Sequence, residues 1–106
     1  MDFVYVGDVA RANLAALRCV QDDAIYNVAS GTETSLLGLW HAIRRMTGRL
    51  DLEPEFHPPR NVNPVPRRLA DTTRARQDLG FVAQVGLDEG LRELAVWRTA
   101  ARQPLL

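Results

Sequence analysis

Apolar residues occur along this chain in two patterns, short continuous runs and helical spacing, and each pattern predicts a secondary-structure element. Residues 2–6 and 25–29 are short runs rich in β-branched and aromatic side chains, which favour strands, and 53–57 is a weaker candidate. Helical spacing of apolar residues predicts helices at 9–20, 36–47, 72–79 and 87–101. The pattern therefore predicts an α/β fold of short strands with about four helices.

Residues with capping chemistry stand at the ends of these predicted helices. Asp8, Ser35 and Asp71 can each accept a backbone amide at a helix start. Gly48 and Gly80 stand where a helix commonly ends in a left-handed residue. The expected buried stripes are Leu36, Leu39, Trp40, Ile43 and Met46 or Thr47 in the second helix, and Leu87, Leu91, Leu94 and Trp97 or Arg98 in the last.

Between the second and third predicted helices lies a proline-rich segment at residues 58–66. Its four prolines remove amide donors and fix φ, so neither a helix nor a central strand fits there. We interpret it as a stiff loop within one unit. Residues 1–106 are therefore expected to form a single domain or part of one.

Composition narrows the function classes. The chain is 46% hydrophobic and 25% charged, which argues against disorder, and its formal net charge of zero gives no reason to expect nucleic acid or an anionic membrane as partner. Every basic residue is arginine, so no mechanism that needs a lysine amine can operate here. The single Cys19 cannot form an internal disulfide, and no signal peptide is evident, so a cytoplasmic location is expected.

Several kinds of active site are missing from the sequence. None of the seven glycines forms the Gly-x-Gly-x-x-Gly turn that brings a backbone close to a dinucleotide pyrophosphate. His41, His57 and Cys19 are too scattered to predict a metal site. No serine or cysteine stands in a nucleophile motif. We therefore predict no catalytic, cofactor-binding or metal-ligating residue in this chain.

Four segments in order carry a family resemblance. They are residues 2–10 (DFVYVGDVA), 26–31 (YNVASG), 67–72 (RRLADT) with Ala75 and LGF at 79–81, and 86–91 (GLDEGL) with Trp97. Their order and spacing resemble the C-terminal portion of extended short-chain dehydrogenases, in the NAD-dependent epimerase/dehydratase family. The resemblance covers nearly the whole chain.

The resemblance implies that this chain lacks the machinery for chemistry. In the family, an N-terminal Rossmann domain holds NAD and carries a Tyr-x-x-x-Lys pair, and both would be missing here. The chain would be a substrate-side portion that binds the diphosphate of a nucleotide sugar and is inactive without the Rossmann domain. The alternative is a non-enzymatic protein-interaction module from a truncated gene.

The same resemblance suggests where substrate would bind. Arg60 lies within the proline-rich loop and Arg67 directly follows it, and a guanidinium can donate two parallel hydrogen bonds to phosphate. The Gly-Asp pair that usually follows the family's loop arginine is absent here, and the spacing is shifted. Asn27 and Thr32 are further candidates near the nucleotide, although Asn27 and Asp71 also suit purely structural roles. Without its Rossmann partner the chain is expected to leave apolar surface uncovered and to self-associate.

Overall fold

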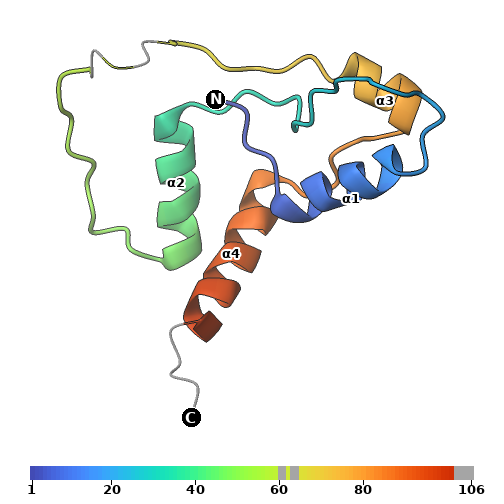
Figure 1. Cartoon of the computed structure of the whole chain (residues 1–106). Coiled ribbons are helices and arrows are strands. Elements are labelled where there is room, and N and C mark those ends of the chain that lie inside the picture. The colour runs from blue at the N-terminus through green and yellow to red at the C-terminus, as the bar shows by residue number, and fades with distance from the viewer. Residues whose placement is uncertain (60–61, 63–64, 102–106) are drawn as a thin grey trace.

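A computed structural model describes residues 1–59, 62 and 65–101. Within them the backbone forms four helices: α1 (Val6–Ala16), α2 (Leu36–Thr47), α3 (Thr73–Leu79) and α4 (Leu87–Ala101). Long stretches without regular structure connect them (Figure 1). The predicted helix count is confirmed for the described part of the chain, and the bounds of α2 and α4 agree with the predicted ranges.

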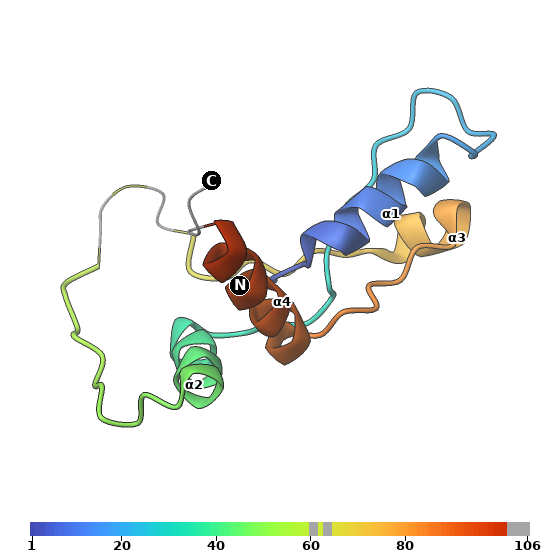
Figure 2. The ribbon, with the colours of Figure 1, turned by 90° about the horizontal axis from the view of Figure 1, so that it is seen from below.

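The helices pack in two pairs, visible in both Figure 1 and Figure 2. Helix α1 lies against α3, and α2 lies against α4. The radius of gyration is 17.0 Å, whereas a compact domain of this length would have about 13 Å. The molecule extends 51 × 44 × 23 Å along its principal axes. The described residues thus form an open arrangement of two helix pairs without one common core.

Apolar burial is concentrated where α1 meets α3. Ala12 and Ala75 lie there with Phe81, and partly buried residues surround them: Tyr26, Val28, Leu79 and Ala83. Among the described residues, the other buried apolar side chains are Ala29 and Ala42. Four of these five core residues are alanines, which remove little apolar area from water. Hydrophobic stabilisation within the chain itself is therefore small.

Large apolar side chains remain exposed on the helices. In α4 the predicted stripe is half-buried at Leu87 and Leu91, but Leu94 is 53% exposed and Trp97 is 64% exposed. In α2 the predicted stripe is likewise divided, because Leu36 and Ile43 are exposed while the others are half-buried: Leu39, Trp40 and Met46. The expectation that these stripes are buried is wrong for their exposed members, since no described element covers them.

Helix α1 differs from its prediction at both ends. It begins at Val6 and ends at Ala16, and Tyr5 is its N-cap residue, so the expectation that Asp8 caps it is wrong. Asp8 lies in the first turn, where its side chain is fully buried. The prediction was wrong because aspartate is a common N-cap residue, whereas the carboxylate of Asp8 accepts hydrogen bonds from residues that are distant in sequence.

Those partners come from the segment that precedes α4. The backbone amides of Gln84 and Val85 each donate to Asp8 Oδ2 at 3.1 Å, and Arg11 donates to Oδ1. Burial alone would raise the pKa of Asp8, but these hydrogen bonds together outweigh it and hold that pKa below the ordinary value of 3.8. Asp8 therefore ties α1 to the chain leading into α4.

Three other helix boundaries follow their predicted caps, whereas the prediction that Asp71 is the N-cap residue of α3 is wrong by one residue, because Thr72 holds that position. Ser35 Oγ accepts the Gly38 amide at 2.9 Å, and Gly48 and Gly80 end α2 and α3 with φ of 68° and 63°. Asp71 lies just outside α3 and accepts the Thr73 amide at 2.9 Å. The described residues of the proline-rich loop form no helix or strand, as predicted.

The predicted strands are wrong for the described residues. Segments 2–5, 25–29 and 53–57 form no sheet, and the single β-bridge joins Asp2 to Glu33. A strand needs a neighbour to take up its backbone hydrogen bonds, and these segments find almost none. The β component of the predicted α/β fold is thus limited, in the described part of the chain, to this one bridge. No described helix is long and apolar enough to cross a membrane.

Candidate functional site

Three of the four predicted substrate-binding residues lie along two extended segments, 27–33 and 67–72. The segments run side by side in opposite directions, because Asn27 contacts Asp71 at one end and Glu33 contacts Arg67 at the other. Arg60 lies outside the described residues. The structure therefore brings Arg67 to Glu33, the residue that follows Thr32 in sequence, and it places Asn27 at the far end of the pair of segments.

Arg67 is held by a carboxylate. Its Nε donates to Glu33 Oε1 at 2.9 Å and to Oε2 at 2.8 Å. The pair is accessible to water, since the Arg67 side chain is 67% exposed and that of Glu33 is 37% exposed. Sequence analysis missed this partner, because 34 residues separate the two side chains and the segment that contains Arg67 does not include Glu33.

The turn that carries Thr32 is fixed by the N-terminal segment. Asp2 Oδ1 accepts the Ser30 amide at 2.8 Å and the Ser30 hydroxyl at 2.6 Å, and Oδ2 accepts the Gly31 amide at 3.0 Å. Gly31 has φ of 73°, a left-handed conformation that favours glycine. The Thr32 amide then donates to Ser30 Oγ at 3.1 Å. The backbone of the candidate site is thus ordered before any ligand arrives.

The ionisation of Asp2 supports this arrangement. Partial burial would raise the pKa of Asp2, but the hydrogen bonds from Ser30, Gly31 and Ala70 outweigh burial and lower it. The carboxylate is therefore ionised at neutral pH, which suits its three accepted hydrogen bonds. Nothing in the sequence marked Asp2 for this role, because its partners lie 28 residues or more away.

Asn27 and Asp71 are both engaged by the protein at the other end of the segments. Asn27 Nδ2 donates to the Asp71 carbonyl oxygen at 3.1 Å. Hydrogen bonds from Thr73 lower the pKa of the Asp71 carboxyl. Asp71 is therefore an ionised residue that accepts an amide at the start of α3, and it is unsuited to act as a general acid. Asn27 retains an exposed position from which a ligand could be reached.

Tyr26 is not poised for proton transfer. Burial, together with the neighbouring Cys19 and Asp78, raises its pKa to about 12. Its hydroxyl lies 3.8 Å from Cys19 Sγ, and Arg74 stacks over its ring at 5.4 Å. A phenol with such a pKa stays protonated at neutral pH, whereas a catalytic acid or base needs a pKa near the working pH. These contacts support a packing role.

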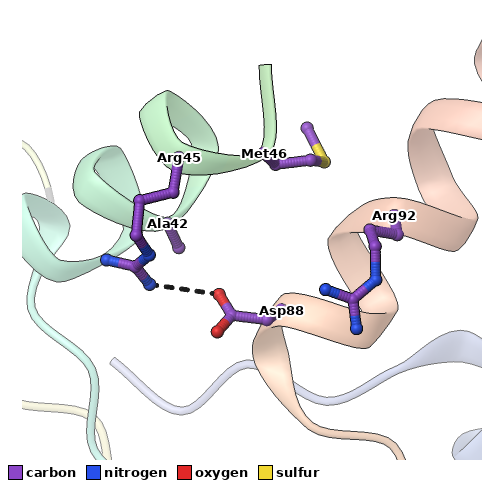
Figure 3. Close-up of a pocket in the computed structure, with 5 residues that line it drawn as sticks. All are labelled: Ala42, Arg45, Met46, Asp88 and Arg92. Atoms are coloured by element: carbon purple, nitrogen blue, oxygen red, sulfur yellow. Dashed lines mark hydrogen bonds and ion pairs between the residues drawn. The ribbon is translucent and has the colours of Figure 1, made fainter. Parts of the chain in front are cut away.

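A separate pocket lies between α2 and α4, and none of the predicted substrate-binding residues lines it. It is lined by Arg45 and Met46 of α2 and by Asp88 and Arg92 of α4, with Ala42 at its base (Figure 3). Arg45 Nη2 donates to Asp88 Oδ1 at 3.2 Å across it. With a volume of about 150 Å³ it is too small for a nucleotide sugar. In the described part of the chain no cluster of three or more metal-binding side chains occurs.

Comparisons of sequence match the chain to part of longer enzymes. UDP-glucose 4-epimerase of Mycolicibacterium smegmatis is 43% identical over 90 residues, which are 85% of this chain and 28% of that protein. Putative UDP-glucose 4-epimerase of Methanocaldococcus jannaschii is 38% identical over 91% of this chain and 30% of its own length. The chain thus spans less than a third of these relatives. No family profile matches it.

A solved structure agrees with these matches. UDP-glucose 4-epimerase of Thermotoga maritima, determined with UDP-glucose, superposes with a TM-score of 0.84 at 35% identity over 95% of this chain and 32% of that one. At this similarity the fold of the chain is shared with about a third of that epimerase. The resemblance to the C-terminal portion of extended short-chain dehydrogenases is confirmed.

Proposed function

Because the chain corresponds to a portion of the extended short-chain dehydrogenases, in the NAD-dependent epimerase/dehydratase family, we propose that it is the substrate-side region of a nucleotide-sugar epimerase. It binds the diphosphate of the sugar nucleotide and is inactive without a nucleotide-binding Rossmann domain. The observation that carries this proposal is the match over 95% of the chain to an epimerase determined with UDP-glucose.

The residues present do not fit NAD. A dinucleotide site in this family needs a strand, a glycine-rich turn and a helix in succession. The chain has no Gly-x-Gly-x-x-Gly sequence, and its described residues form only the Asp2–Glu33 bridge in place of a sheet. We therefore assign NAD to another domain. In the complete enzyme, extended segments such as 25–29 are expected to find their β neighbours in that domain, which would restore the α/β character.

Each candidate residue has a distinct task in the proposed site. Arg67 and Arg60, which belongs to the proline-rich loop, would donate to the phosphates. Thr32 stands on the turn ordered by Asp2 and would contact the nucleoside. Asn27 would contribute its amide from the far end of the paired segments. Residues 1–106 would then act together as one substrate-binding region.

Arg67→Gln is expected to weaken UDP-glucose binding to the chain about fivefold to tenfold, because it removes one charge-assisted contact of about 1 kcal/mol. The affinity is measured from the amide chemical shifts of Thr32 and Glu33 during a titration to millimolar ligand. Arg18→Gln removes the same charge from an exposed position after α1 and is expected to leave binding unchanged. Absent shifts at Thr32 and Glu33, or equal losses in both variants, would contradict the proposed site.

A second candidate function is a protein-interaction module. It is favoured by the exposed apolar side chains, such as Trp97 at 64% exposure, which a protein partner would cover. The two functions differ in what the turn at Thr32 does. In a substrate-binding region the amide shifts at Thr32 change on addition of UDP-glucose, whereas in an interaction module they change only on addition of the protein partner.

A further inference from the structure

The guanidinium of Arg67 is only partly used within the protein. Its Nε serves both oxygens of Glu33, and among the described residues its two Nη groups have no hydrogen-bond acceptor. Arginine binds phosphate best through two parallel N–H donors, and one edge of the group contains Nε. Glu33 therefore occupies a donor that a phosphate oxygen would also use.

We propose that Glu33 is a built-in competitor for the anion at Arg67, a role that rests on the proposed function of this site. An exposed ion pair of this kind contributes little, so a phosphate of sufficient charge can displace the carboxylate. A weakly charged anion cannot displace it as readily. Glu33 would thereby set a threshold that favours diphosphate ligands over singly charged anions.

The competitor is held in position by the same network that orders the turn. Glu33 pairs through its backbone with Asp2, and Asp2 fixes the preceding residues Ser30 and Gly31. The Glu33 side chain is also the less exposed member of the pair, at 37% against 67% for Arg67. When phosphate arrives, the arginine is thus the group expected to move, while the carboxylate stays.

Inorganic pyrophosphate is the probe, because it tests the anion site without the nucleoside or sugar. We expect Glu33→Gln to bind pyrophosphate about three- to fivefold more tightly than the unmodified 106-residue chain. Glu93→Gln removes the same charge from an exposed position on α4 and serves as the matched control. The gain should disappear when Glu33→Gln is combined with Arg67→Gln, because the competition acts through Arg67.

The ¹⁵N-edited signal of Arg67 Nε gives a second readout that does not depend on ligand affinity. Its hydrogen exchange should be slowed in the unmodified chain and faster in Glu33→Gln. Equal pyrophosphate affinity in Glu33→Gln and Glu93→Gln, or no pyrophosphate binding in any variant, would overturn the proposal. If pyrophosphate follows the expected pattern but UDP-glucose does not bind, the competition stands and the nucleotide-sugar function falls.

Discussion

Replacing Asp8 by alanine is expected to raise the rate of amide hydrogen exchange at Gln84 and Val85 about a hundredfold. Both amides donate to this carboxylate, which is fully buried and also pairs with Arg11. Removing it leaves the donors without their charged acceptor, at a cost of about 3 kcal/mol, which corresponds to a hundredfold in the opening equilibrium. Exchange monitored by NMR measures this locally, without requiring that the whole chain unfold cooperatively.

Asp22→Ala is the matched control, since Asp22 is exposed in the turn after α1. A similar change in both variants would show that Asp8 does not tie α1 to the segment before α4. The pH dependence gives an independent check. Because the folded-state pKa of Asp8 is below 3.8, its stabilisation is present above that pH and is lost as the pH falls through the lower folded-state value. Asp8→Asn should lack this acid transition.

Trp97→Glu is expected to weaken self-association of the chain about thirtyfold. Trp97 lies on the same face of α4 as Leu94, three positions earlier, and both side chains are more than half exposed. Such a patch is expected to be covered by another molecule, and truncating or charging a central tryptophan in an interface costs about 2 kcal/mol. Sedimentation velocity across a concentration series gives the dissociation constants.

Gln21→Glu supplies the same added charge at an exposed polar position and should leave the association constant unchanged. If the unmodified chain is monomeric at all concentrations, or if both variants weaken association equally, the patch on α4 is not the contact surface. In the proposed complete enzyme the same face would be covered by the rest of the protein.

Local chemistry made the helices predictable. Ser35, Gly48 and Gly80 act within a turn of their own helix, so their roles could be inferred from neighbouring residues. Asp8 could not be assigned correctly, because its partners Gln84 and Val85 are 76 and 77 residues away. The strand predictions were wrong for a related reason, since a strand needs a neighbouring strand and the described residues supply only one isolated bridge.

The residues of the candidate site could be predicted from the sequence, but their hydrogen-bond partners could not. Thr32 and Arg67 were identified through the family resemblance, and the structure adds a carboxylate partner to each region: Glu33 pairs with Arg67, and Asp2 fixes the turn that carries Thr32. These pairings could not be inferred from motifs, because they join segments that are distant in sequence. The exposure of the apolar stripe at Trp97 could not be predicted either. The spacing of apolar residues identifies the apolar face of a helix, but it does not say what covers that face.

The central claim is that this chain contributes substrate contacts and relies on another domain for NAD. The most direct test is conversion of UDP-glucose to its C4 epimer, measured in the presence of NAD. The purified chain is assayed alone and as a replacement for the matching segment of the Mycolicibacterium smegmatis UDP-glucose 4-epimerase, to which it is 43% identical. We predict no conversion by the chain alone and measurable conversion by the chimera. Conversion by the unaided chain, or a folded chimera that binds NAD but not UDP-glucose, would contradict the claim.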